Sequence, residues 1–378
     1  MHVGLNLVFL VPGEQGGLEV YARELVRALA AERAGVRFTS FVNRDVRTSG
    51  DRTDWTQLGD VVELPVSARR RVEWVRGEQL LLPGLARRAG VDLVHSLAGT
   101  APARGPFRRV VTIHDLHYRT LPDAHFGIRG LGMRVLVPLA ARRSDRVIVP
   151  SPQTAADVRR HLRVPEDRID LVADGAGHSP TAVAEAQDVL RRRHGLGDRQ
   201  VVLTVSAKRP HKNLARLLGA LAAIAAEHRP VLVMPGYRTP HERELRVRAD
   251  ELGVRDDVRF LGWVADGELE GLYGLASLFV FPTLHEGFGL PLLEAFDRGV
   301  PVACSNVASL DHVAGDAALR FDPRDPRSIA GAIERLLGDR GEAARLVAAG
   351  RIQVARFDWA ATARGTLASY ERALASPS

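Results

Sequence analysis

The sequence is poor in cysteine and in lysine. Its 378 residues include one cysteine, Cys304, which excludes an internal disulfide framework and indicates a reducing compartment. Of the 52 basic residues, all but Lys208 and Lys212 are arginine, and these two lysines share one short segment. A lysine supplies a compact, mobile charge where a planar guanidinium does not fit. The segment is therefore a candidate site for such a charge, and chance clustering is the alternative.

Long apolar runs and metal-binding triplets are also missing. No run reaches the roughly 20 residues that cross a bilayer. The apolar first twelve residues have no cationic segment before them and no small-residue cleavage site after them, so we expect no signal peptide and a cytoplasmic protein. The chain contains no Asp-x-Asp triplet, the pattern expected where a metal bridges a diphosphate, so we expect no metal and no cofactor.

Length and charge narrow the class of protein further. A chain of 378 residues with 46% hydrophobic composition is large enough for two domains with ordinary cores. A net charge of +7 and a pI near 10.2 favour acidic partners, which include nucleotide phosphates, anionic lipids and nucleic acid. The basic stretches lack interleaved aromatic residues, so we do not expect nucleic-acid binding.

The order of apolar and amphipathic segments predicts an α/β protein. We expect strands at 1–11, 36–42, 61–64, 91–95, 110–113, 146–149 and 169–172, and residues around 48 and 52–55 as loop. Helical segments alternate with these strands, which favours a parallel sheet covered on both faces. Small residues and glycines after residue 172 indicate a hinge, and the strand at 201–206 begins a second domain.

One stretch of the second domain, TLHEGFGLPLLEAFDR at 283–298, carries the clearest chemistry. It follows the short apolar run 278–281, so a strand, a turn and a helix are expected in that order. Gly287 and Gly289 permit close backbone approach, and a helix start attracts anions. Glu286 and Glu294 flank it and can accept hydrogen bonds from hydroxyl groups, which suggests a nucleotide-sugar site. The alternative is a surface cap with two solvated glutamates.

Two further segments place polar groups at expected strand ends. The strand at 110–113 runs into His114 and Asp115, at the edge where open α/β folds bind ligands. Asp115 could orient a ligand, cap the loop or assist an acceptor hydroxyl, whereas His117 and His125 read as loop residues. The Gly16-Gly17 turn before a helix does not fit the dinucleotide fingerprint and is weak evidence by itself.

The run EGFGLPLLEA resembles the Glu-x7-Glu motif of retaining family 4 glycosyltransferases (glycosyl transferases group 1). The resemblance implies the GT-B fold, two Rossmann-like domains facing across a cleft. The implied domains are residues 1–175 on the acceptor side and residues 176–355 for the nucleotide sugar, with a terminal helix at 356–378 returning to the first. In the family, the basic loop before Asn213 touches phosphate. Lys212 matches this pattern, and the sequence leaves Lys208 and Arg209 open as its partner.

The resemblance also implies a role for each candidate residue. The implied catalytic residues are His114, Lys212 and Glu286, and Asp115 is an acceptor-side candidate. Trp263 either borders the base of the donor nucleotide or is a packing residue. The implied donor-binding residues are Gly16, Gly17, Lys208, Arg209, Val264, Gly287, Phe288, Gly289, Leu290 and Glu294.

The implied reaction is metal-independent transfer of a hexosyl group from a nucleoside diphosphate sugar, with retention, to a hydroxyl of a glycan, a lipid-linked saccharide or a small molecule. Similarity to mannosyltransferase-like members favours GDP-mannose slightly. A nucleotide-sugar epimerase of GT-B fold and a non-catalytic nucleotide-sugar-binding protein are the alternatives. The basic segment 68–90 is compatible with peripheral contact with the inner membrane face or with a solvated face over a core stripe.

Overall fold

The computed structural model describes residues 1–378 except 33–34, 49–52, 121–127, 178–181 and 376–378. The chain forms two compact units. Unit 1 comprises residues 1–175 together with 357–378, and unit 2 comprises residues 176–356. The end of the chain therefore belongs to the same unit as its beginning.

Unit 1 is built on a seven-stranded parallel sheet with the order β3-β2-β1-β4-β5-β6-β7. Its strands are β1 (His2–Leu7), β2 (Arg37–Asn43), β3 (Asp60–Leu64), β4 (Leu93–Ser96), β5 (Arg108–Thr112), β6 (Arg146–Val149) and β7 (Ile169–Leu171). Each overlaps a strand predicted from the sequence. The inner strand β1 is buried along its whole length, as expected where helices cover both faces of a parallel sheet.

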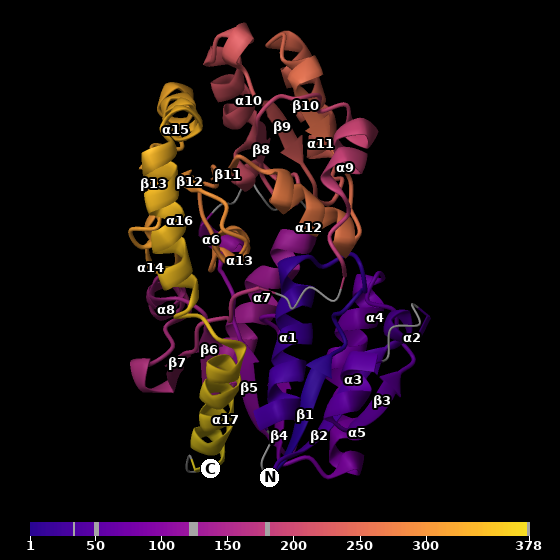
Figure 1. Ribbon diagram of the computed structural model, residues 1–378. Helices are drawn as coiled ribbons and strands as arrows, with labels where there is room; N and C mark the ends of the chain where they lie inside the picture. Colours follow the sequence, from indigo (N-terminus) through magenta and orange to yellow (C-terminus); the bar gives the residue numbers. More distant parts are fainter. Residues whose placement is uncertain (33–34, 49–52, 121–127, 178–181, 376–378) are drawn as a thin grey trace. The chain divides into compact units, whose positions relative to one another are not determined.

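Helices connect these strands and cover the sheet (Figure 1). They are α1 (Gly17–Glu32), α2 (Arg44–Thr48), α3 (Thr53–Leu58), α4 (Arg71–Arg76), the π-helical turn η1 (Gly77–Leu81), α5 (Leu82–Ala89), α6 (His117–Thr120), α7 (Ile128–Arg143), α8 (Pro152–Asp157), the π-helical turn η3 (Val158–Leu162), the 3-10 turn η4 (Glu166–Arg168) and α17 (Trp359–Ala375). Helix α17 packs on α1 and on β5 and β6.

The predicted loop around Thr48 and Trp55 is wrong where the structure describes it. Helices α2 and α3 occupy these positions, and Trp55 is buried in the core of unit 1. The Arg23 guanidinium lies over the Trp55 ring at 5.4 Å, which holds α3 against α1. Short helices of this kind depend on tertiary packing, which local sequence does not report.

Unit 2 contains a six-stranded parallel sheet with the order β10-β9-β8-β11-β12-β13. The strands are β8 (Val201–Leu203), β9 (Val231–Met234), β10 (Val258–Phe260), β11 (Leu278–Phe281), β12 (Val302–Ser305) and β13 (Ala318–Phe321). The two parallel-sheet units confirm the predicted fold class.

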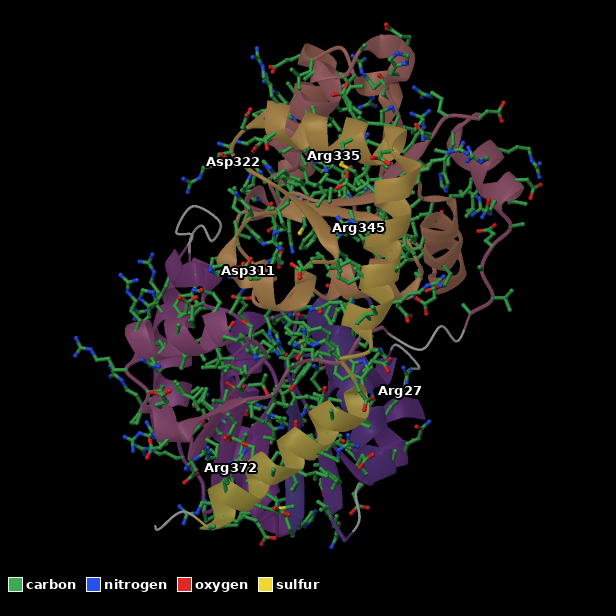
Figure 2. The ribbon with its side chains drawn as sticks, turned by 60° about the vertical axis from the view of Figure 1, so that its left-hand side comes forward. Arg27, Asp311, Asp322, Arg335, Arg345 and Arg372 are labelled. Atoms are coloured by element: carbon green, nitrogen blue, oxygen red, sulfur yellow. The ribbon has the colours of Figure 1, made fainter. Side chains whose placement is uncertain are left out.

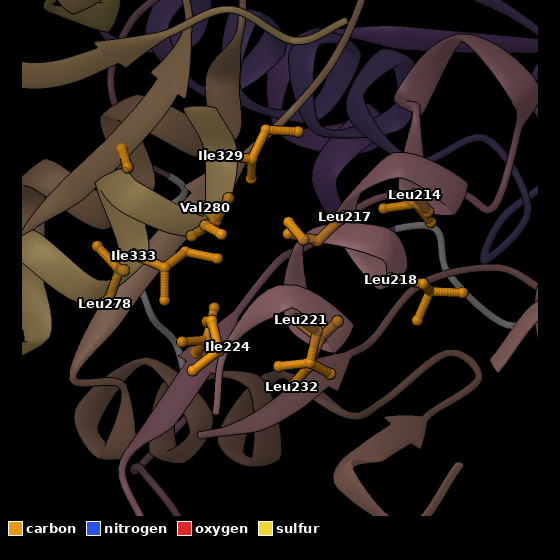
Figure 3. Close-up of a cluster of buried hydrophobic side chains, with 14 of the residues drawn as sticks. Leu214, Leu217, Leu218, Leu221, Ile224, Leu232, Leu278, Val280, Ile329 and Ile333 are labelled. Atoms are coloured by element: carbon orange, nitrogen blue, oxygen red, sulfur yellow. The ribbon is translucent and has the colours of Figure 1, made fainter. Parts of the chain in front are cut away.

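The helices of unit 2 are α9 (Gln187–His194), the 3-10 turn η5 (Pro210–Lys212), α10 (Leu214–Ala223), the 3-10 turn η6 (Ala226–His228), α11 (His241–Glu251), the 3-10 turn η7 (Arg255–Asp257), α12 (Asp266–Leu275), α13 (Leu290–Asp297), α14 (Ala308–Ala314), α15 (Pro326–Gly338) and α16 (Arg340–Val354). Figure 3 shows part of its core, where Leu217 of α10, Val280 of β11 and Ile333 of α15 lie in one apolar cluster. This core fixes one face of β11, the strand that leads into the candidate site.

Candidate functional site

The candidate site of unit 2 begins where β11 ends. The strand stops at Phe281, a loop follows, and α13 starts at Leu290, so the predicted order of strand, turn and helix is confirmed. Gly289 has φ 109° and ψ 41°, and a Cβ atom there would lie 3.0 Å from Leu310 Cδ2. The left-handed dihedral favours glycine, and a Cβ atom would also press on the Leu310 side chain. Pro291 lies in the first turn of α13, where its missing N–H costs nothing.

The structure brings Lys212 and Glu286 together from segments 74 residues apart. Lys212 Nζ lies 2.6 Å from Glu286 Oε1, and both side chains are largely buried. The ammonium group also lies 5.2 Å from the centre of the Phe281 ring. The Glu286 amide donates to Ser309 Oγ at 3.1 Å, which fixes the carboxylate from its backbone side. A charge-assisted pair of this kind holds both groups in defined positions.

Asn213 positions Lys212, and the sequence analysis missed its role. Its backbone is left-handed, with φ 60°, and its side-chain amide donates to Pro282 O (2.9 Å) and Pro323 O (2.7 Å). Its neighbour His211 accepts at its carbonyl from the Leu284 amide at 2.9 Å. These bonds join the lysine loop to the loop after β11. The available signal was the Asn after Lys212, since Asn is one of few residues that tolerate this conformation.

Glu294 lies in α13 with a different set of partners. Its Oε2 accepts a hydrogen bond from the Tyr273 hydroxyl at 2.8 Å, and its carbonyl accepts from Arg298 at 3.0 Å. Arg298 lies over the Tyr273 ring at 4.8 Å and pairs with Glu270. Burial raises the pKa of the Tyr273 hydroxyl well above its ordinary value, so the hydroxyl stays a donor to the carboxylate. Sequence reasoning did not identify this support.

The structure separates the two lysines. Lys208 is fully buried, and its Nζ donates to Gly236 O (2.7 Å) and Leu261 O (2.6 Å). Burial lowers the pKa of its ammonium group to about 8. This placement argues against the predicted phosphate contact, because the ammonium group is enclosed and already binds two carbonyls. Arg209, the other open candidate, is half-buried, and its part in phosphate binding stays a prediction.

The loop after β10 carries Trp263 and Val264. Trp263 is 56% exposed, and its ring stacks on Tyr237 with centroids 4.7 Å apart and an angle of 23°. Val264 is half-buried. Tyr237 follows β9, so the two rings come from adjacent strands at the carboxyl edge of the sheet. The indole is thus a surface ring with one stacked neighbour, which is unlike an ordinary packing residue.

In unit 1, His114 follows the end of β5. Its Nε2 donates to Leu97 O at 2.9 Å, and burial lowers the pKa of the ring below its ordinary value. The Tyr21 ring meets it edge-on at 4.5 Å. The His114 carbonyl accepts from Thr154 Oγ1 at 3.1 Å, so the backbone at the strand end is also fixed.

Asp115 caps its loop, which is one of its three predicted alternatives, and the other two stay predictions. Its Oδ1 accepts from the His117 amide at 2.9 Å, and its Oδ2 lies 3.3 Å from His117 Nδ1. His117 is buried, and His125 lies outside the described residues. Asp115 thus caps the first turn of α6, where a carboxylate is favoured.

The Gly16-Gly17 turn starts α1 as predicted. Gly16 has φ 56°, and its carbonyl accepts from the Glu19 amide at 2.9 Å. Glu19 Oε2 accepts in return from the Gly13 amide at 2.8 Å, so the glycine turn is held in one conformation. The turn can therefore present a defined backbone surface, whatever it binds.

The basic segment 68–90 forms α4, η1 and α5, with no single continuous α-helix. Two of its arginines are paired with carboxylates, Arg69 with Glu14 at 2.6 Å and Arg70 with Glu73 at 3.0 Å. Val72 is 83% exposed and Leu80 is 70% exposed. Among the described residues, no helix is both long enough and apolar enough to cross a bilayer.

Two parallel-sheet α/β units give the chain the architecture of GT-B proteins. The family pattern "Glycosyl transferases group 1" matches residues 186–353, and "Glycosyltransferase Family 4" matches residues 15–179. The chain belongs to glycosyltransferase family 4.

Two curated relatives support this family. The O-antigen chain mannosyltransferase B of Escherichia coli is 34% identical over 269 residues, which is 70% of each chain. The D-inositol 3-phosphate glycosyltransferase of Acidothermus cellulolyticus is 30% identical and covers 96% of this chain and 87% of its own length.

Solved structures share the fold at lower identity. The sucrose-phosphate synthase of Thermosynechococcus elongatus has a TM-score of 0.80 at 24% identity, with 100% of both chains covered. Anabaena Alr3699/HepE in complex with UDP-glucose has a TM-score of 0.78 at 19% identity, with 98% of this chain and 99% of that chain covered. These likenesses support the GT-B architecture.

Proposed function

We propose that the protein transfers a hexosyl group from a nucleoside diphosphate sugar to an acceptor hydroxyl, with retention of anomeric configuration. The observation that carries the proposal is the buried Lys212–Glu286 pair beside the start of α13, with Glu294 farther along the same helix. A positive group, a helix start and two carboxylates suit a diphosphate flanked by sugar and ribose hydroxyls.

The chemistry follows from where charge develops. Breaking the bond between sugar and phosphate builds negative charge on the leaving diphosphate. Lys212 and the positive end of the α13 dipole stabilise that charge in a preorganised site. Before the donor binds, Glu286 holds Lys212 in place, and afterwards its second oxygen serves the sugar hydroxyls. The departing phosphate takes the proton of the acceptor hydroxyl, so the proposal needs no separate general base and no metal.

The remaining site residues have narrower roles. Glu294 binds the ribose, and the loop from Gly287 to Leu290 approaches the phosphates through its backbone. Arg209 assists Lys212. In unit 1, His114 contacts the transferred sugar, and burial, which lowers the pKa of its ring, favours the neutral form that suits a hydrogen bond to a hydroxyl group. GDP-mannose is the proposed donor, since the relative from Escherichia coli is described as a mannosyltransferase.

The test of the proposal is substitution of Lys212. Lys212→Ala should slow turnover roughly 10²-fold or more at saturating donor, as the loss of an oxyanion donor does. Arg243→Ala, which removes an exposed charge on α11, is the matched control and should leave turnover unchanged. Equal turnover in both variants would contradict the assignment of Lys212. Product analysis without acceptor separates a transferase from an epimerase, because an epimerase needs no acceptor.

The proposed location is the cytoplasmic side of the membrane, with peripheral contact through α4 and η1. Exposed Val72 and Leu80 beside the arginines of this segment support it. Sedimentation with anionic vesicles, compared with neutral vesicles, tests this contact. No difference between the two vesicle types in 0.1 M salt would argue for a solvated face.

A further inference from the structure

Lys208 joins three loops at the carboxyl edge of the unit 2 sheet. Its side chain leaves the loop after β8 and donates to Gly236 O after β9 and to Leu261 O after β10. Its backbone takes part as well, because the Lys208 amide donates to Tyr237 O at 3.4 Å and its carbonyl accepts from Thr239 Oγ1. The ammonium group is completely shielded from solvent.

The packing around this junction leaves little room for adjustment. Gly236 has φ 132°, and a Cβ atom there would lie 2.0 Å from Ser206 O. The Gly236 amide donates to Gly262 O at 3.0 Å, which ties the second loop directly to the third. Glu242 of α11 raises the pKa of Lys208, whereas burial, Arg246 and Arg238 lower it. Hydrogen bonds therefore join the three loops around the buried Lys208 side chain.

The two rings of the aromatic pair, Tyr237 and Trp263, sit next to the carbonyls that Lys208 holds. Tyr237 directly follows Gly236, and Trp263 lies two residues after Leu261. The stacking of the two rings, with centroids 4.7 Å apart, thus depends on the spacing between the second and third loops. Lys208 bridges these two loops with its two hydrogen bonds, beside the direct bond from Gly236 to Gly262.

The aromatic pair also lies in line with the proposed phosphate site. The strand order β10-β9-β8-β11 places the aromatic pair after β10 and β9, and the Lys212–Glu286 pair after β8 and β11. Adjacent strands are about 4.8 Å apart, so three strand spacings match the reach of an extended nucleoside diphosphate. A base face is the part of that ligand that stacks on an exposed indole.

We propose that Lys208 is a positioning residue whose buried ammonium group holds the aromatic pair in register, and that this pair stacks the base of the donor nucleotide. The inference rests on the proposed function, because it assigns the base end of the same ligand. Lys208 thus contributes to recognition of the donor nucleotide without contacting its phosphates.

The first experiment measures binding of GDP, UDP and inorganic pyrophosphate by calorimetry. Trp263→Ala should lower the affinity for both nucleotides about 5- to 150-fold, the range known for loss of one stacked base. The affinity for pyrophosphate should not change. Trp263→Phe should restore most of the affinity. Lys212→Ala should lower the affinity for all three ligands. Arg243→Met on α11 is the control and should change none of these affinities.

The second experiment asks whether Lys208 acts through the aromatic pair. Lys208→Met should weaken GDP but not pyrophosphate, and should reduce the near-ultraviolet circular dichroism of the stacked rings. In a double-mutant cycle, Lys208→Met should cost little further affinity once Trp263→Ala is present. If Lys208→Met does not fold, Thr239→Val replaces it, because this variant removes a hydrogen bond to the Lys208 carbonyl. Thr239→Val should also weaken GDP binding without changing pyrophosphate binding, by a smaller factor than Lys208→Met.

The possible outcomes separate the two proposals. If the wild-type protein binds neither the nucleotides nor pyrophosphate, the proposed function fails. The proposed function stands if the wild-type protein binds the nucleotides and pyrophosphate and Lys212→Ala weakens this binding. If Trp263→Ala nevertheless leaves GDP binding intact, the aromatic pair has no role in it. Fully additive losses in the double-mutant cycle would overturn the positioning role of Lys208.

Discussion

At the scale of single residues, the two lysines show how far residue type predicts position. The sequence singled out both, and the structure gives them opposite environments. Lys212 reaches Glu286, whereas Lys208 is enclosed by backbone carbonyls. The position of Lys212 was predictable from the motif around it. The burial of Lys208 was not, because it arises from three loops that meet only in the folded sheet.

A pH-dependent stability follows from the burial of Lys208. Its pKa falls from an ordinary 10.5 to about 8 in the folded protein. Between these values the unfolded chain binds a proton that the folded protein does not, so stability rises with pH across this window. Wild type should therefore gain stability relative to Lys208→Met from pH 8 to pH 10.5, by at most about 3 kcal/mol.

Urea unfolding of both proteins at several pH values measures this difference. Other titrating groups contribute equally to wild type and variant and cancel in the comparison. A stability difference that is flat across the window, or that falls as the pH rises, would show that Lys208 keeps an ordinary pKa in the folded protein.

At the scale of elements, the strand, turn and helix at 278–297 were predictable because glycine, proline and periodicity act locally. The supports of this motif were not. Asn213, Tyr273 and Ser309 contact it from the loop before α10, from α12 and from α14. None of them lies within a helical turn of the motif in sequence, so no local pattern links them to it. Helices α2 and α3 were missed for the same reason.

Gly289 allows the start of α13 to be tested separately from its charges. Gly289→Ala should destabilise unit 2 by about 1–2 kcal/mol, because an L-residue resists the left-handed conformation. It should also weaken donor binding, because the turn must shift by contact with Leu310. Thermal unfolding and donor affinity are the two measurements.

Gly331→Ala provides the matched control. Gly331 is exposed in α15, has no positive φ, and a Cβ atom there would meet nothing within 4 Å. This variant should be more stable by about 0.8–1 kcal/mol, the difference in helix propensity. The idea of a strained turn fails if both variants shift stability in the same direction.

At the scale of the whole molecule, the chain is organised as two units with separate cores, and unit 1 is completed by the end of the chain. Arg372 of α17, labelled in Figure 2, lies 2.9 Å from Asp170, and Ser369 donates to the same carboxylate at 2.6 Å. Tyr370 is buried, and its hydroxyl lies 2.8 Å from His95 Nδ1. The apolar periodicity of α17 was visible in the sequence, but its partners in β4 and β7 were not.

Tyr370→Ala tests whether α17 is part of the core of unit 1. Loss of a buried aromatic side chain costs about 3–5 kcal/mol, so hydrogen-exchange protection should fall throughout unit 1. Amides of unit 2 should keep their protection, because its core is separate. The matched control is Ile352→Ala, whose side chain is 74% exposed on α16 and whose loss should be nearly neutral. Equal loss of protection in both units would mean that they unfold together.

The charge balance of the proposed reaction leads to the last prediction, which concerns metals. A leaving diphosphate needs compensating positive charge, which a bound cation or the protein itself can supply. Here Lys212 and the start of α13 are the proposed source. Turnover should therefore be unchanged in excess chelator, and added Mg²⁺ should not rescue Lys212→Ala. A chelator-sensitive rate that returns with Mg²⁺ would instead assign that charge to a metal, and Lys212 would then act only in binding.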